Sequence, residues 1–251
     1  MRRSIDLNSD LGEGAGTEPA LMPLITSANV ACGAHAGDER AMRQAVALAI
    51  EHGVSVGAHP GYPDRERFGR VALELAEDEL VASLRAQIET LAAVASRAGT
   101  RLTHVKAHGA LYNQAERDAT VARTIVAALR STTTASDLVV FAPPGSAMHA
   151  EAERAGLRIA REGFIDRAYE PDGTLRSRKL TGALLTDPVA ASRQALSFVK
   201  DGGVVASDGT FLELDVDTLC VHGDTPRAPE IARAVRDAFR TGGVEVVAFR
   251  S

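Results

Sequence analysis

The sequence predicts a single α/β domain over residues 1–251, folded as an irregular (β/α) barrel of the TIM type with seven or eight mainly parallel strands. Short apolar runs alternate with amphipathic helical stretches along the whole chain, which favours parallel strands joined by helices. The length of 251 residues suits one such domain. No linker or low-complexity tract divides the chain. An open, doubly wound sheet is the alternative architecture.

The predicted strands are short runs rich in Val, Ile and Leu. They cover residues 4–8, 27–31, 54–58, 102–106, 138–142, 157–161 and 218–222, with a further candidate at 244–249. Helix caps and stops predict helices from Asp38 to Gly53, over 77–98, from Asp187 to about Gly202, and from about Pro229 to Gly242. Residues 163–186 show no clear strand or helix. Residues 203–216 predict a hairpin that turns at Asp208-Gly209.

Composition argues against several classes of protein. The net charge of −5 disfavours nucleic-acid binding, which usually needs a basic face. Aromatic residues are few, with no Trp, and this disfavours stacking surfaces for sugars or bases. Cys32 and Cys220 form no metal or disulfide motif and are expected to be buried thiols. With no signal-peptide pattern and no long apolar run, we expect a cytoplasmic protein that does not enter the membrane.

Four histidines follow predicted strands, each next to a glycine or another small residue. They are His35, His59, His108 and His222. A single histidine in such a place is more often a hydrogen-bonded turn residue than a catalyst. Because parallel strands bring their carboxyl ends to one face, four such histidines together predict a shared site at that face.

The first predicted strand runs into an acidic turn rich in glycine. Asp10 and Glu13 stand three residues apart, and Gly12 and Gly14 let the backbone turn tightly and aim N–H groups at an anion. The turn lacks the Gly-Lys-Ser/Thr sequence of a P-loop. It is either a solvated acidic turn or part of a catalytic site.

Basic residues supply candidates for binding an anion. Side chains alternate along a strand, so Lys106 shares a face with His108, and a lysine aimed into a barrel end needs an anion or a carboxylate beside it. His104 in the same strand is expected in the core or behind the site. The Asp166-Arg167 pair, and Arg70 in a long loop, could hold a carboxylate or phosphate. The alternative for both arginines is a surface ion pair.

Six strings of residues resemble the LamB/YcsF family. They are DLNSDLGEG (6–14), NVACGAHAGD (29–38), VSVGAHPGY (54–62), HVKAHGALYN (104–113), DRAY (166–169) and CVHGD (220–224). They occur in the family's order and span nearly the whole chain. Two positions depart from the family pattern, because Ala107 stands where proline is usual and Val71 where a second arginine is common.

The resemblance implies a barrel related to carbohydrate deacetylases and a hydrolase activity. The family is expected to cleave 5-oxo-L-proline to L-glutamate with hydrolysis of ATP, with Mg²⁺ beside the nucleotide, in a complex with two other subunits, B and C. Lys106 with Arg167 or Arg70 would then stabilise charge, Asp10, Glu13 or His108 would activate water, and His35 and His59 would orient the reacting groups. Contacts to substrate or phosphate would come from Gly12, Gly14, Tyr62, Arg70, Tyr112, Asn113, Asp166, Arg167, His222 and Asp224.

Two other functions remain open from the sequence. The chain could be a metal-dependent amide hydrolase or deacetylase that uses no ATP, with Asp10, His35 and His59 as ligands of zinc or a similar ion. It could also be a non-catalytic scaffold subunit whose partners carry out the reaction. The density of ionisable residues after the predicted strands argues against the scaffold.

Overall fold

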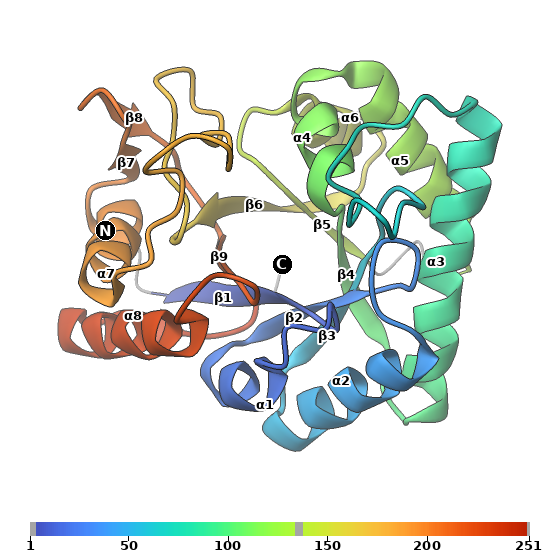
Figure 1. The fold of residues 1–251 in the computed structure, drawn as a ribbon, viewed down its shortest axis with the longest axis horizontal. Helices are drawn as coiled ribbons and strands as arrows, with labels where there is room; N and C mark the ends of the chain where they lie inside the picture. The colour runs from blue at the N-terminus through green and yellow to red at the C-terminus, as the bar shows by residue number, and fades with distance from the viewer. Residues whose placement is uncertain (1–3, 134–137, 250–251) are drawn as a thin grey trace.

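Seven parallel strands close into a barrel in the computed structural model, which describes residues 4–133 and 138–249 (Figure 1). The strands are β1 (Ser4–Leu11), β2 (Ser27–Ala31), β3 (Ser55–His59), β4 (Leu102–Lys106), β5 (Val139–Ala142), β6 (Arg158–Phe164) and β9 (Thr218–His222). Pairing of β1 with β9 completes the ring. The predicted barrel is therefore confirmed and the open sheet is wrong. The candidate strand at 244–249 is only β10 (Glu245–Val246), paired with the start of β1.

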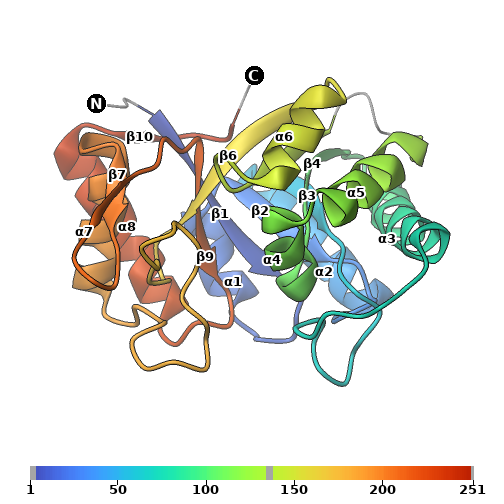
Figure 2. The ribbon, with the colours of Figure 1, turned by 90° about the horizontal axis from the view of Figure 1, so that it is seen from above.

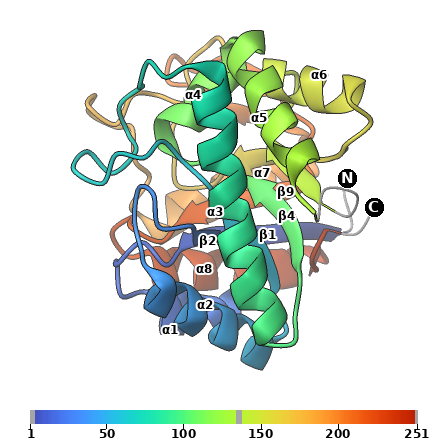
Figure 3. The same cartoon turned by 90° about the vertical axis from the view of Figure 1, so that its right-hand side faces the viewer.

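Helices cover the outside of the barrel. They are α1 (Glu18–Leu21), the 3₁₀ helix η1 (Met22–Leu24), α2 (Glu39–His52), α3 (Glu77–Arg97), α4 (Gly109–Arg117), α5 (Ala119–Ser131), α6 (Ala147–Arg154), α7 (Pro188–Lys200) and α8 (Ala228–Gly242). The predicted caps are present, since Asp38 accepts a hydrogen bond from the N–H of Ala41 and Asp187 from that of Ala190. Figure 3 shows α3 lying between α2 and α5, with which it packs.

Long loops gather at one end of the barrel. Figure 2 shows residues 60–76 and 165–187 at the end opposite the start of β1, which is the end where the parallel strands finish. Residues 165–187 hold no helix or named strand, but two isolated bridges, Arg167 with Leu184 and Tyr169 with Leu175, fold the segment on itself. The predicted hairpin at 203–216 is confirmed as β7 (Gly203–Val205) and β8 (Phe211–Glu213).

Two strands extend three residues beyond their predicted ends. The polar residues Ser9 and Asp10 in β1 and Glu162 in β6 interrupt the apolar runs that were used to place the strands. The structure buries these polar residues inside the fold, where other strands supply their partners. For example, Asn8 donates to Glu162 Oε1 at 3.0 Å and Asn29 donates to Asp10 Oδ1 at 2.8 Å. Buried polar groups that find such partners are compatible with a strand.

His104 belongs to this buried polar interior. Its Nε2 lies 2.8 Å from Oδ1 of Asn29, and its ring stacks on that of Phe141 at 4.3 Å between centroids. Burial, with the nearby charge of Lys106, lowers the pKa of His104 from 6.5 to about 3. The sequence predicted that His104 lies in the core or behind the site, and its 2 % exposure agrees with this.

The buried neutral His104 should make stability depend on pH. The unfolded chain takes up a proton at this residue below its ordinary pKa of 6.5, while the folded chain resists it down to about 3. The stabilisation that the neutral His104 gives to the folded state is therefore complete above pH 6.5. As the pH falls below 6.5, the free energy of unfolding decreases by up to ~1.4 kcal/mol per pH unit. Urea unfolding at pH 7 and pH 5 should show a loss about 2 kcal/mol larger for the wild type than for His104→Gln. Equal losses in the two proteins would contradict this prediction.

Candidate active site

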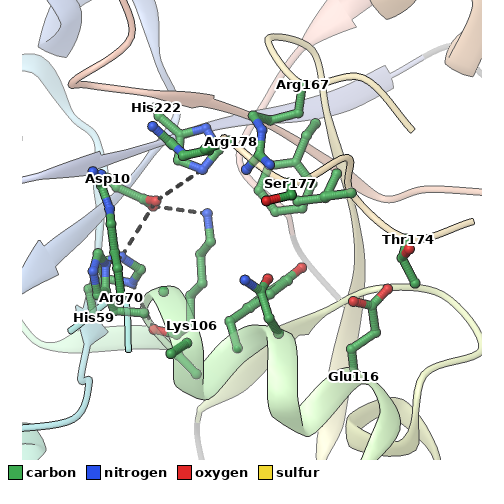
Figure 4. Close-up of a pocket in the computed structure, with 18 of the residues that line it drawn as sticks. Asp10, His59, Arg70, Lys106, Glu116, Arg167, Thr174, Ser177, Arg178 and His222 are labelled. Carbon is green, nitrogen blue, oxygen red and sulfur yellow. Dashed lines mark hydrogen bonds and ion pairs between the residues drawn. The ribbon is translucent and has the colours of Figure 1, made fainter. Parts of the chain in front are cut away.

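A cavity of about 530 Å³ opens at the mouth of the barrel where the strands finish (Figure 4). Asp10 of β1, His59 of β3 and Lys106 of β4 reach it from the strand ends, and α4 and the segment after β6 supply its other walls. The register of the strands fixes how far along the barrel axis these side chains lie. Asp10 is aligned with Asn29 of β2 and with His222 of β9, so these residues lie at the same height in the barrel. The ionisable strand ends predicted from the sequence therefore do meet at one mouth.

A buried lysine joins two carboxylates at the floor of this cavity. Lys106 Nζ lies 2.9 Å from Asp10 Oδ1 and 2.9 Å from Glu162 Oε1, with all three side chains almost inaccessible to solvent. Burial disfavours the charged lysine, but the carboxylates outweigh it and hold the pKa of Lys106 well above its usual value. Tyr112 donates to the other oxygen of Glu162 at 2.8 Å. The ammonium charge is thus already matched by protein groups.

Asp10 stays ionised despite its burial. Burial alone would raise its pKa, but His59 and Lys106 hold that pKa well below the usual value. Its second oxygen, Oδ2, lies 3.5 Å from Nε2 of His59 and 4.0 Å from Nε2 of His222, so the carboxylate stands at the centre of the cluster, as the dashed lines in Figure 4 show.

Three imidazoles surround the carboxylate of Glu13. Its Oε1 lies 3.1 Å from His108 Nδ1, 3.2 Å from His35 Nε2 and 3.7 Å from His59 Nε2. Burial opposes ionisation of Glu13, yet hydrogen bonds from His108 and His35 and the nearby imidazole charge lower its pKa overall. Burial also lowers the pKa of His35 to about 4. For His59 burial is outweighed by Asp10 and Glu13, which raise its pKa.

His222 is the imidazole most open to the cavity. Its Nδ1 lies 3.0 Å from Asp166 Oδ1, and the buried Asp166 also accepts hydrogen bonds from the His222 N–H and the Thr225 hydroxyl. Burial is outweighed by His222 and these hydrogen bonds, and the pKa of Asp166 is lowered. The carboxylate fixes the proton on Nδ1 and leaves Nε2 facing Asp10, which is the orienting arrangement of a general base.

Arginines line the outer part of the cavity. Arg167 donates through Nη2 to the carbonyl of Arg176, but its buried Nε has no hydrogen-bond partner among the described residues. Burial and the charge of Arg178 lower the pKa of Arg167 to about 10. Arg70 pairs with Asp224, which Arg178 also approaches at 3.4 Å. The adjacent Asp166 bonds His222, and the structure shows no ion pair between Asp166 and Arg167 among the described residues, so the alternative of such a pair is not supported.

Other predicted contact residues lie in different places. Tyr112 and Asn113 line the cavity. Tyr62 is buried and donates to Gln114 at 2.6 Å instead, and it is not among the lining residues. Neither Gly12 nor Gly14 lines the cavity, and the N–H of Gly12 is taken by Glu18. The structure therefore gives no support to a phosphate cradle in the turn after β1.

The sequence did not single out several residues of the site. The sixth strand predicted from the sequence ends at residue 161, so Glu162 falls just after it, whereas the structure places Glu162 inside β6. Side chains two positions apart in a strand point the same way, so the nearby apolar Phe164 could have indicated that Glu162 points inward. Cys220 lies 3.0 Å from Lys106 Nζ, and burial raises the pKa of this thiol. The metal-ligand grouping also differs, because Glu13, His35, His59 and His108 cluster together while Asp10 groups with Cys220 and His222.

Fold and site together define a TIM-like (β/α)-barrel protein of the class that builds enzyme sites at the carboxyl ends of its strands. None of the helices in the described part of the chain is long and apolar enough to span a lipid bilayer. A family model described as "LamB/YcsF family" matches residues 5–251. The chain belongs to the LamB/YcsF family.

Known relatives cover the chain from end to end. It is 48 % identical to the A subunit of 5-oxoprolinase from Methylococcus capsulatus, over 99 % of this chain and 96 % of that protein. It is 46 % identical to the A subunit of 5-oxoprolinase from Thermus thermophilus, over 98 % of this chain and 99 % of that protein. A crystal structure of the "Lactam Utilization Protein" from Thermus thermophilus superposes with a TM-score of 0.90 at 45 % identity, covering 98 % of this chain and 100 % of that one.

Proposed function

We propose that this chain is the A subunit of an ATP-dependent 5-oxoprolinase and that its cavity opens the lactam ring of 5-oxo-L-proline to give L-glutamate. The observation that carries the proposal is one cavity with three suitable groups. Arg167 is a buried guanidinium that forms no ion pair with a carboxylate of the described residues, Asp10 is an ionised acid, and His222 is an oriented imidazole. The names and full-length similarity of the relatives support the same activity.

Arg167 is the group we assign to the substrate carboxylate. 5-Oxoproline is a small five-membered lactam whose only full charge at neutral pH is that carboxylate. Lys106 is less suitable, because Asp10 and Glu162 already match its charge, and Arg70 is paired with Asp224. A buried arginine with free donors can bind a carboxylate through two parallel hydrogen bonds.

The ring opens at the bond between carbonyl carbon and nitrogen. The lactam carbonyl is a poor electrophile, and transfer of a phosphoryl group from ATP to its oxygen makes the carbon easier to attack. Water then adds to the carbon, the C–N bond breaks as the ring nitrogen takes up a proton, and the product is an acyl phosphate. A second water hydrolyses this acyl phosphate to L-glutamate and phosphate. We assign proton transfer to His222, held by Asp166, with Asp10 stabilising the positive imidazole that forms. Lys106 fixes the position of Asp10.

ATP and Mg²⁺ are assigned to the assembled enzyme rather than to this cavity alone. None of the three glycines in the turn after β1, Gly12, Gly14 and Gly16, lines the cavity, and the chain has few aromatic side chains that could stack on adenine. The proposal therefore includes the two further subunits, B and C, which would supply the phosphoryl transfer. The assembly is expected to work in the cytoplasm.

Reconstitution with subunits B and C tests the proposal. The complex should release glutamate and ADP from 5-oxoproline and ATP. The Arg167→Gln variant should raise the KM for 5-oxoproline about 10- to 100-fold, since a hydrogen bond to a charged group contributes ~1.5–3 kcal/mol. The Asp10→Asn variant should lower kcat instead. Arg193→Gln, on the exposed side of α7, is the matched control.

Three results would contradict the proposal. The first is a complex that contains all three subunits but forms no glutamate. The second is an Arg167→Gln enzyme with an unchanged KM. The third is near-normal turnover by Asp10→Asn.

A further inference from the structure

We propose that Glu13, His59 and His108 form an open binding site for one divalent transition-metal ion, with zinc as the best match. The three donor atoms are Glu13 Oε1, His59 Nε2 and His108 Nδ1, separated by 3.0, 3.1 and 3.7 Å. Ligand atoms around a tetrahedral zinc ion with bonds of ~2.0–2.1 Å lie about 3.3–3.4 Å apart. The triangle of donors therefore has the size of one face of such a coordination shell.

Backbone carbonyls fix the protonation of both imidazoles. His59 Nδ1 lies 2.8 Å from the carbonyl oxygen of Lys106, and His108 Nε2 lies 2.9 Å from that of Phe68. A carbonyl oxygen only accepts, so each of these nitrogens carries a hydrogen. The other two nitrogens, His59 Nε2 and His108 Nδ1, lie 3.0 Å apart and offer lone pairs to a metal ion once they carry no proton.

Without a metal, a proton on His59 Nε2 or His108 Nδ1 is held by Asp10 or Glu13, whose carboxylates lie 3.5 and 3.1 Å from these nitrogens. A metal ion would displace that proton and bind both imidazoles and the Glu13 carboxylate together. Histidine ligands of metals usually donate their second N–H to a carbonyl or a carboxylate, which fixes ring and tautomer. Both His59 and His108 already have that support.

His35 acts behind the three ligands as a positioning residue. Its ring stacks on His108 at 3.7 Å with only 3° between the planes, and two parallel stacked rings cannot both aim in-plane lone pairs at one ion. His35 Nε2 instead lies 3.2 Å from Glu13 Oε1 and holds that carboxylate in place. Glu13, His59 and His108 line the cavity whereas His35 does not, so a fourth coordination position would open into the cavity.

The second cluster at the mouth is a poorer place for a metal. Asp10, Cys220 and His222 also bring possible ligand atoms together. However, Lys106 Nζ already donates to both Asp10 Oδ1 and Cys220 Sγ, at 2.9 and 3.0 Å. A metal ion at that place would have to stand beside a buried ammonium group. Charge repulsion therefore favours the site at Glu13.

Two imidazoles and one carboxylate make up a ligand set of open zinc sites, and this set suits zinc better than magnesium or calcium. A bound ion there would polarise a carbonyl or a water molecule that reached its open position. The inference does not depend on the proposed lactam chemistry, because binding of the metal alone can be measured in the isolated chain.

The experiment uses the full chain, freed of metal with a chelator and titrated with ZnCl₂. Elemental analysis and calorimetry should show one zinc ion per chain, and data collected at the zinc absorption edge should place one anomalous peak between Glu13, His59 and His108. His108→Ala and the isosteric Glu13→Gln should each weaken binding at least about 100-fold. The positioning variant His35→Gln should weaken it about 10- to 100-fold, as substitutions beyond the direct ligands do.

Control variants separate this site from chance binding by other histidines. His52→Gln and His149→Gln, both away from the cavity, should bind zinc as the wild type does. Absence of stoichiometric zinc in the wild type would overturn the inference. So would an anomalous peak at Asp10 and His222, or unchanged affinity in folded Glu13→Gln. If His108→Ala does not fold, Glu13→Gln and the wild-type anomalous peak still decide the question.

Discussion

Replacing Lys106 with methionine should destabilise the protein and sharply lower the proposed turnover of the complex reconstituted with subunits B and C. The substitution leaves Asp10 and Glu162, each 2.9 Å from the lost ammonium, as buried carboxylates without their common cation. Removing one partner of a buried ion pair costs about 3–5 kcal/mol of unfolding free energy. Turnover should fall at least about 100-fold, because Asp10 loses the group that fixes its charge and position.

A double mutant identifies the source of that loss. Lys106→Met with Glu162→Gln removes one of the stranded charges, and Gln can still accept a hydrogen bond from Tyr112, as Glu162 does. It should recover about 1–3 kcal/mol of stability relative to the sum of the single variants, while turnover stays low. Lys200→Met at the exposed end of α7 is the control and should leave both measurements unchanged. If the losses of unfolding free energy in Lys106→Met and Glu162→Gln simply add in the double variant, measured by urea unfolding, then the stranded carboxylate is not the source of the destabilisation.

Replacing Gly57 with alanine should be one of the most damaging changes available in the core. A Cβ at Gly57 would lie 2.1 Å from the ring of His104. That ring cannot easily move, because it bonds Asn29 and stacks on Phe141. Overpacking of this kind costs about 3 kcal/mol or more, which should lower Tm by about 6–12 °C in a chain of this size.

Gly242→Ala is the matched control for this change. Its Cβ, in the last turn of α8, would come closest to the flexible end of the Lys200 side chain, at 3.2 Å, and would make an ordinary contact with Leu196 at 3.5 Å. Alanine favours the helix by up to ~1 kcal/mol, so Tm should stay level or rise slightly. The double variant Gly57→Ala/His104→Ala should lose less stability than the sum of the losses in the two single variants, because removing the imidazole makes room for the new methyl group. A Gly57→Ala protein with the Tm of the wild type would mean that the His104 ring does not need the space left by the missing side chain at Gly57.

The strand ends were predictable because they depend on local pattern. Apolar runs followed by small residues placed His59, Lys106 and His222 correctly at the carboxyl ends of their strands. The period of two along a strand also put Lys106 and His108 on one face. The helices at 109–117, 119–131 and 147–154 were not read from the sequence. Two of them nevertheless begin at capping side chains, Asp118 and Ser146.

The partners across the barrel could not be predicted in the same way. That Lys106 meets Glu162, or that Glu13 rather than Asp10 joins His35 and His108, depends on how seven strands close and on which rotamer each side chain takes. By itself the sequence determined the alternation of strands and helices, the family, and the arrival of Asp10, His59, Lys106 and His222 at the mouth. Local periodicity and short runs of neighbouring residues are enough to indicate these features. Only the tertiary structure decided which charges pair, because residues more than fifty positions apart come into contact through register and closure that no local pattern encodes.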